Sequence, residues 1–190
     1  MEKKPKHTRN QPAELIKVVL YGPESTGKTT LAKQLAEHYK TLWVSEYMRE
    51  FLQKKWDFEK KLVEKEDLIP IAKGQLQLEK DASQKAENLL ICDTNLLELK
   101  VYSEYYYDGF CPSEIKTEAT KANYSIYLLT YVDTPWEPDI LRDRPNNRGE
   151  MFRIFEAELK KQGFPYKILK GNEEERFKKA TEIIDTLLDR

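Results

Sequence analysis

The sequence predicts an α/β domain of three layers, in which helices cover both faces of a five-stranded parallel sheet. Five apolar runs of strand length alternate with longer segments of helical spacing, which is the order of a parallel βαβ sheet. The third run, "NLLICD", is apolar at nearly every position, as expected of a strand buried on both faces. The 190 residues, 39% of them hydrophobic, are sufficient for one domain with one core.

The expected elements follow from the spacing of apolar residues and from proline. We expect strands at 15–22, 41–47, 88–93, 124–131 and 165–171. Helical patterns occupy 29–40, the long charged stretch from Met48 to about Leu89, 94–108 and 173–189. Pro70 should interrupt the long stretch by starting a new helix. In the last helix, Phe177, Ile184 and Leu188 are expected to form the inner stripe.

Composition restricts the location and partners of the protein. With 32 basic and 33 acidic residues the net charge is −1, so no overall field draws the chain to nucleic acid or to an anionic membrane. No apolar run approaches the ~18 residues that membrane insertion by a spanning helix requires. Cys92 and Cys111 lack zinc-ligand spacing and predict no disulfide scaffold, so a reducing cytoplasm is expected. Residues 1–13 are expected to form a flexible basic leader, and residues 14–190 a single domain.

The stretch "GPESTGKTT" after the first strand has the pattern of a phosphate-binding loop. Gly22, Gly27, Lys28 and Thr29 satisfy G-x-x-x-x-G-K-[ST] between an expected strand and an expected helix. The glycines let successive N–H groups turn toward one anion, and the helix N-terminus adds to the attraction. Lys28 is placed to reach the β- and γ-phosphates, and Thr29 to ligate Mg²⁺. The sequence predicts a nucleoside triphosphate site formed by Gly22, Pro23, Glu24, Ser25, Thr26, Gly27, Lys28, Thr29 and Thr30.

A second metal ligand is expected at the end of the third strand. Asp93 closes "LLICD" at the carboxyl edge of the sheet, where ligands of open parallel sheets collect. A carboxylate there can hold Mg²⁺ directly or through water. The alternative is that Asp93 caps the helix that begins at Thr94, and the two roles are compatible.

The second strand ends in "SEYMRE", which brings more polar groups to the same edge. Glu46 is expected to face the cleft opposite the phosphate loop, where it could accept the proton of an attacking hydroxyl or hold sugar hydroxyls. Arg49 lies one turn further on, and a surface ion pair between the two residues is the alternative. Together with Glu46, Arg49 and Asp93, we expect Tyr47, Asn95 and Trp136 to contact the acceptor.

A segment after the fourth strand has the composition of a lid. Arg142, Arg144 and Arg148 stand within seven positions among prolines and asparagines. Such a cluster suits a mobile lid at about 137–150, in which Arg142 would screen the transferring phosphoryl group. The alternative is a charged surface loop, in which nearby aspartates pair with these arginines.

Five segments together resemble the ribosylnicotinamide kinase domain of NadR-type NAD-biosynthesis proteins. That domain is a P-loop kinase of the nucleoside- and nucleotide-kinase-like group. The matches run from end to end of the chain and are more specific than the phosphate loop alone. They are "GPESTGKTTLAKQLA", "VSEYMREF", "ICDTNLLELKVYSEYYYD", "YLLTYVDTPWEPDILRD" and "GFPYKIL" with "GN" and "EER" after it.

The resemblance implies ATP- and Mg²⁺-dependent phosphorylation of a small vitamin-derived nucleoside, with ribosylnicotinamide as the leading acceptor. It implies that Glu46 and Asp93 face the substrate ribose and Mg²⁺, that Arg142 belongs to the lid, and that Gly171 and Asn172 start the loop near the adenine. The related bifunctional proteins carry an adenylyltransferase domain and some a DNA-binding domain. About thirteen residues precede the first strand here, so we expect neither activity.

The identity of the acceptor and the class of protein both have alternatives. Ser45 stands where the best-known family pattern has an aromatic residue that helps to sandwich the nicotinamide ring, so another nucleoside or a thiamine-like vitamin stays open. The catalytic base is either Glu46 or Asp93. A nucleotide-dependent switch or regulatory ATPase is the alternative of a different class. It would hydrolyse ATP without an acceptor.

Overall fold

A computed structural model describes residues 14–121, 123–137 and 147–189 of the protein. The expected leader and Arg142 lie outside these residues. The elements, in chain order, are β1 (Ile16–Tyr21), α1 (Lys28–His38), β2 (Leu42–Val44), α2 (Tyr47–Glu59), the 3₁₀ turn η1 (Lys65–Asp67), α3 (Leu68–Ser83), β3 (Leu89–Asp93), α4 (Leu96–Tyr106), α5 (Ser113–Lys121), β4 (Ile126–Thr130), α6 (Arg148–Gln162), β5 (Tyr166–Leu169) and α7 (Glu173–Leu188).

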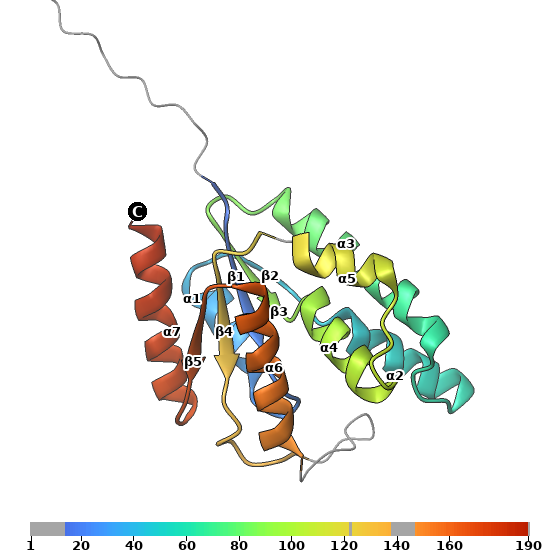
Figure 1. Ribbon diagram of the computed structural model, residues 1–190. Coiled ribbons are helices and arrows are strands. Elements are labelled where there is room, and N and C mark those ends of the chain that lie inside the picture. The colour runs from blue at the N-terminus through green and yellow to red at the C-terminus, as the bar shows by residue number, and fades with distance from the viewer. Residues whose placement is uncertain (1–13, 122, 138–146, 190) are drawn as a thin grey trace, which may run out of the picture.

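The five strands form one parallel sheet in the order β2-β3-β1-β4-β5 (Figure 1). The first strand along the chain is therefore the central one, with Val19 paired to Cys92 of β3 on one side and to Tyr127 of β4 on the other. Since the chain crosses from β3 over β1 to β4, the loops after β1 and β3 meet at the carboxyl edge of the sheet. Ligands of open α/β sheets bind at such a switch point.

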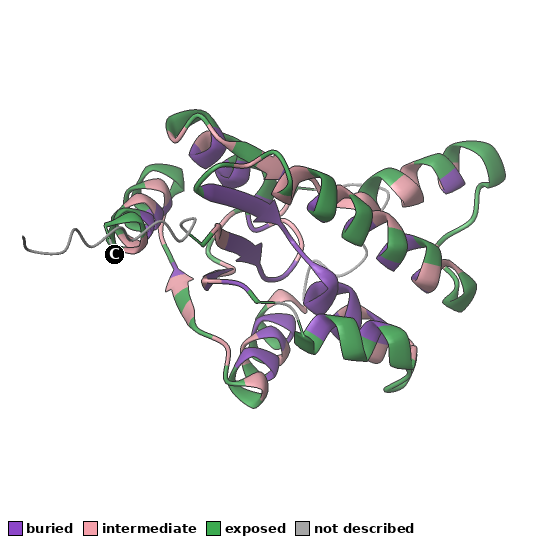
Figure 2. Cartoon of the chain, turned by 90° about the horizontal axis from the view of Figure 1, so that it is seen from above, coloured by how far each residue is buried: buried purple, intermediate pink, exposed green. Residues whose placement is uncertain are grey.

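Alternate residues of β1 face two different cores. Val18 and Leu20 pack in a cluster with residues of α1 and α7, whereas Val19 and Tyr21 pack in a larger cluster with residues of α3, α4, α5 and α6. Seen from above, the buried residues lie mainly on the central strands β1, β3 and β4 and on the inner sides of the helices (Figure 2). This period-two division between helical layers confirms the predicted three-layer α/β architecture.

Several element boundaries differ from the sequence prediction. The second strand has only three residues, because the backbone leaves it before Glu46 and α2 begins at Tyr47. Pro70 does not start α3 but lies in its first turn, where the missing N–H has no intrahelical acceptor. Leu188 is 38% exposed, so the prediction that it belongs to the inner stripe of α7 was wrong. Ile184 is fully buried.

Two helices were not predicted, and one of them changes the extent of the lid. Helix α5 packs on α4, and α6 begins at Arg148, within the range expected for the lid. Met151, Phe155 and Leu159 are buried at helical spacing on α6, a signal that the sequence does contain. Residues 148–150 are therefore helical, and 138–146 lie outside the described residues. Among the helices of the described ranges, none is both long and apolar enough to cross a membrane.

Candidate active site

The phosphate loop joins β1 to α1 at the centre of the sheet edge and depends on two glycines. Gly22 has φ +136°, and a Cβ there would lie 2.8 Å from the Thr130 side-chain oxygen of β4. Gly27 has φ +79° immediately before α1. Thr26 is buried, and its hydroxyl donates to the Pro23 carbonyl at 2.7 Å. At Gly22, only glycine tolerates both the close approach to β4 and the positive φ, and at Gly27 the positive φ favours glycine. The local backbone therefore explains the two glycines of the sequence pattern.

Lys28 lies back across this loop. Its Nζ donates to the carbonyl oxygens of Gly22 at 2.7 Å and Pro23 at 2.9 Å. It also lies 3.4 Å from Oε1 of Glu98 on α4, and both side chains are buried. The lysine therefore contacts the phosphate loop and a buried carboxylate. It is expected to leave these contacts when it binds the phosphates of a nucleotide.

Thr29 and Asp93 meet directly beside Lys28. The Thr29 hydroxyl donates to Asp93 Oδ2 at 2.6 Å, and the other oxygen of Asp93 is buried with no hydrogen-bond partner among the described residues. Burial raises the pKa of Asp93, while Thr29 and nearby cations act in the opposite direction. A hydroxyl beside a carboxylate with an unsatisfied oxygen is a donor set that fits Mg²⁺ bound mainly through nucleotide phosphates. No group of three or more His, Cys, Asp or Glu side chains that could hold a metal occurs within the described ranges.

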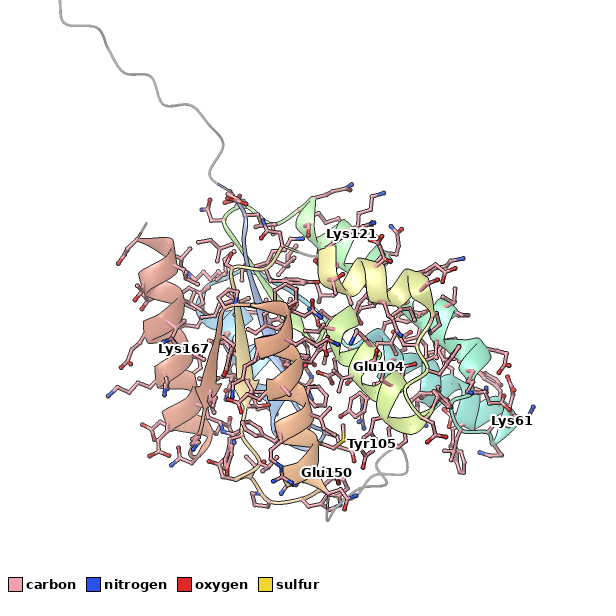
Figure 3. All side chains as sticks on the ribbon, in the orientation of Figure 1. Lys61, Glu104, Tyr105, Lys121, Glu150 and Lys167 are labelled. Atoms are coloured by element: carbon pink, nitrogen blue, oxygen red, sulfur yellow. The ribbon has the colours of Figure 1, made fainter. Side chains whose placement is uncertain are left out.

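One cavity of about 1090 Å³ connects the phosphate loop to the helical layer. Its nucleotide end is lined by the loop itself and by the segments after β4 and β5, including Asp133, Gly171 and Asn172. Its other end is largely apolar and is lined by Met48, Leu52, Leu62, Val63, Leu68, Leu99, Tyr102, Tyr106 and Tyr107. In Figure 3, Lys61, another lining residue, lies at the outer end of the helical layer, and Lys167 of β5 lies on the opposite side of the molecule. The volume exceeds the ~300–1,000 Å³ of a typical single-ligand site.

Glu46 and Arg49, which the sequence analysis expects on the acceptor side, are among the residues that line this cavity. The other expected acceptor contacts are placed differently. Tyr47 packs its ring against Gly74 of α3, where a Cβ would lie 2.1 Å from it. Asn95 caps α4 and donates to the Tyr127 hydroxyl at 3.0 Å. Neither Tyr47 nor Asn95 lines the large cavity, because both side chains hold helices of this layer in place.

Arg148, near the end of the range expected for the lid and at the start of α6, docks on the phosphate loop. Its guanidinium donates to the carbonyl oxygens of Ser25 at 3.0 Å and Thr134 at 2.7 Å, and it lies 5.7 Å from the centre of the Trp136 ring. Trp136 therefore packs on this arginine and is not among the residues that line the cavity. Figure 3 shows Glu150 of α6 and Tyr105 of α4 at the same end of the molecule.

Comparison with known proteins agrees with this geometry. The family model AAA_28, described as an AAA domain, matches residues 17–176. The chain belongs to this family. The trifunctional NAD biosynthesis/regulator protein NadR of Salmonella typhimurium is 25% identical over 135 residues, which are 71% of this chain and 33% of the relative, and NadR of Escherichia coli gives the same values. The chain spans about a third of the length of these curated relatives.

Solved structures show the same fold. A crystal structure of NadR protein in complex with NR superposes with a TM-score of 0.72 at 20% identity, over 88% of this chain and 49% of that one. Deoxyadenosine kinase from M. mycoides superposes with a TM-score of 0.68 at 15% identity, over 90% of this chain and 100% of that one. This member of the AAA domain family thus has the fold of P-loop nucleoside kinases, and the resemblance to NadR is confirmed.

Two residues next to the phosphate loop, Arg176 and Glu98, were not predicted from the sequence. Arg176 of α7 is 3% exposed and donates to the carbonyl oxygens of Thr26, Gly171 and Tyr131 and to Asp133. It thereby joins the phosphate loop to both segments at the nucleotide end. Glu98 is 2% exposed, and burial raises its pKa to about 8, with Lys28 opposing and Glu46 and Asp93 adding to the shift. The signal for Glu98 was a charged residue inside the apolar run "LLELK".

Proposed function

We propose that the protein is an ATP- and Mg²⁺-dependent kinase that transfers the γ-phosphoryl group to a hydroxyl of a small nucleoside or vitamin. The observation that carries this proposal is one cavity whose lining includes the phosphate loop, a set of apolar side chains from the helical layer, and Glu46. A switch ATPase needs only the first of these parts. An apolar compartment that is continuous with the phosphate loop favours a reaction with two substrates.

At the nucleotide end, this chain supplies positive charge and orientation. Lys28 would leave the loop carbonyls and contact the β- and γ-phosphates. Thr29 and Asp93 would hold Mg²⁺, which neutralises charge on the same phosphates when it is bound. The adenine would lie by Gly171 and Asn172, which line that end of the cavity. Arg142, outside the described residues, is proposed to act from the lid.

At the acceptor end, Glu46 is the proposed base. Glu46 is among the residues that line the cavity, and Asp93, which accepts from the Thr29 hydroxyl at 2.6 Å, is not. In the transfer, the acceptor oxygen forms a bond to the γ-phosphorus, the bond from that phosphorus to the β,γ-bridging oxygen breaks, and ADP leaves. The hydroxyl proton passes to Glu46. Arg49, on the first turn of α2, would help to position the acceptor.

Ribosylnicotinamide is the acceptor that we favour, with NMN as the product. The support is the similarity to NadR in sequence and in fold. The apolar end of the cavity, with Tyr102, Tyr106 and Tyr107, suits a flat ring in the absence of an aromatic side chain at Ser45. Tyr102 and Tyr106 come from α4 and Tyr107 follows it directly, so the ring would be held by a different element from the one expected in the family pattern.

The test is an acceptor panel. Purified protein is mixed with ATP, Mg²⁺ and, one at a time, ribosylnicotinamide, common nucleosides and thiamine, and ADP release is followed. The proposal expects ADP release to increase at least about tenfold over the acceptor-free rate with one acceptor, and the phosphorylated product to appear in equal amount. ADP release that is the same with and without every acceptor would support the switch ATPase instead.

A further inference from the structure

Glu98 is a buried carboxylate at the junction of the two ends of the cavity. It stands in the first turn of α4 and lines both the large cavity and a small pocket behind it. Its Oε1 lies 3.4 Å from Lys28 Nζ, and its Oε2 is buried without a hydrogen-bond partner among the described residues. An unsatisfied buried oxygen beside the residue that binds phosphates needs a physical explanation.

The contact with Lys28 cannot persist unchanged once a triphosphate occupies the loop. The ammonium group that now lies next to Glu98 is the group expected to bind the β- and γ-phosphates. When it moves to them, an ionised Glu98 would lose its counter-charge and face a polyanion from a site that excludes water. Like charges at short range in a buried site strongly favour the neutral form of the weaker acid. A neutral carboxyl group also gains an O–H donor, which an anion can accept.

We propose that Glu98 binds the nucleotide as a neutral carboxylic acid, which donates a hydrogen bond to the terminal phosphate and which, in molecules where it is ionised before binding, takes one proton from solvent as Lys28 moves. The proposal rests on the proposed function only in that the loop binds a triphosphate, and it is independent of the acceptor. It assigns Glu98 to nucleotide binding, and the role of base stays with Glu46.

The groups around Glu98 favour this protonation. Lys28 of α1 is the cation that stabilises its charge, whereas Glu46, before α2, and Asp93 of β3 both disfavour it. The Tyr21 hydroxyl of β1 and the Tyr102 hydroxyl of α4 also face Glu98. Burial raises the pKa of both hydroxyls, and the charge of Glu98 raises it further. Helix α3 contributes Ile71 and Gln75 to the pocket that Glu98 lines, and neither titrates. On α6, Glu158 is paired with Lys100 at 2.8 Å.

Together, burial and the neighbouring carboxylates favour protonation of Glu98 more strongly than Lys28 opposes it. Burial already raises the pKa of Glu98 to about 8 with Lys28 beside it, so loss of that partner raises it further. If only the protonated form binds nucleotide, the dissociation constant should increase about tenfold between pH 7 and pH 9. Near pH 9, where free Glu98 is mostly ionised, binding should take up close to one proton.

The experiment is calorimetric titration of the full chain with Mg²⁺ and AMP-PNP. Titrations at pH 7, 8 and 9, each in two buffers of different ionisation enthalpy, give the dissociation constant and the number of protons taken up. Glu98→Gln, which keeps the shape and a donor but cannot titrate, should lose most of the pH dependence of AMP-PNP affinity. Glu118→Gln is the matched control. It removes an exposed carboxylate of α5, 3.2 Å from Lys121, and should keep the wild-type pH dependence of AMP-PNP binding.

The results separate the inference from the proposed function. Wild-type protein that binds AMP-PNP at pH 9 without proton uptake overturns the assignment of Glu98, even if the Gln variant does not fold. The assignment is also overturned if Glu98→Gln keeps the wild-type pH dependence. It fails equally if that variant binds AMP-PNP normally but loses turnover, in which case Glu98 would act as the base. A wild-type protein that binds no AMP-PNP at any pH overturns the proposed function itself, and this inference with it.

Discussion

Replacing Arg176 tests whether one buried side chain holds the nucleotide end together. Arg176→Met removes a guanidinium that donates to Gly171 O at 2.9 Å, Tyr131 O at 2.8 Å, Thr26 O and Asp133. Arg176→Lys keeps the charge but replaces the planar fork by one ammonium group, which can reach only part of this set. The two variants therefore separate the effect of charge from that of geometry.

The expected loss of stability follows from burial. The Arg176 side chain is 4% exposed, so its removal leaves buried carbonyl oxygens unsatisfied and the partly exposed Asp133 unpaired. An acceptor that loses its donor costs roughly 1–3 kcal/mol when it is buried and less when it is partly exposed, so for the four acceptors of Arg176 we expect a total of roughly 3–5 kcal/mol for the methionine variant and about half of that for the lysine variant. At about 2–4 °C per kcal/mol for a domain of this size, the melting temperature should fall by roughly 6–20 °C for Met and 3–10 °C for Lys.

Nucleotide affinity should fall together with stability. Because Arg176 fixes the Thr26 carbonyl of the phosphate loop, we expect the lysine variant to bind AMP-PNP about tenfold more weakly, which corresponds to about 1.4 kcal/mol. Thermal unfolding and calorimetric titration measure the two effects. A lysine variant with wild-type melting temperature and wild-type affinity would refute this role of Arg176, because the planar geometry of the guanidinium would then contribute nothing.

The remaining predictions concern the reaction and its pH dependence. Lys28→Ala should abolish phosphoryl transfer in a coupled ADP assay, and near-normal turnover would remove Lys28 from its assigned role. Glu46→Gln should lower turnover about 10²-fold with little change in ATP affinity, and weakened ATP binding instead would place Glu46 outside the acceptor site. Asp93→Asn should raise the Mg²⁺ concentration needed for half-maximal activity by about tenfold, which an unchanged Mg²⁺ titration would contradict. The pKa of Glu98 is raised from 4.5 to about 8 on folding, so the stability it contributes should be present below about pH 4.5 and be lost as the pH rises to about 8. Thermal melts from pH 5 to 8 should show this loss in the wild type and not in Glu98→Gln, and equal slopes would contradict it.

The fold and the phosphate loop could be predicted because local sequence determines them. The strands are short apolar runs, and the loop requires glycine at Gly22, where a Cβ would meet β4, and at Gly27, where φ is positive. Asp93 and Glu46 followed from topology, because the ends of parallel strands meet at one edge of the sheet.

The other parts of the site depend on how the helices pack. Tyr47 and Asn95 follow site strands in the sequence, but their side chains turn to Gly74 and Tyr127 and stabilise the helical layer. Glu98 becomes a site residue only because α4 packs its first turn against the phosphate loop. Arg176 reaches that loop from a helix about 150 positions away in the sequence. No spacing rule within one sequence connects such distant residues.

A crystal structure with AMP-PNP and Mg²⁺ would show directly whether the loop after β1 binds the triphosphate. We expect the triphosphate within the loop of residues 22–27 and Lys28 Nζ withdrawn from the Gly22 and Pro23 carbonyls onto the β- and γ-phosphates. We also expect the cavity beyond Glu46 to stay open for the acceptor. A nucleotide bound elsewhere, with Lys28 still on the two carbonyl oxygens, would contradict this expectation.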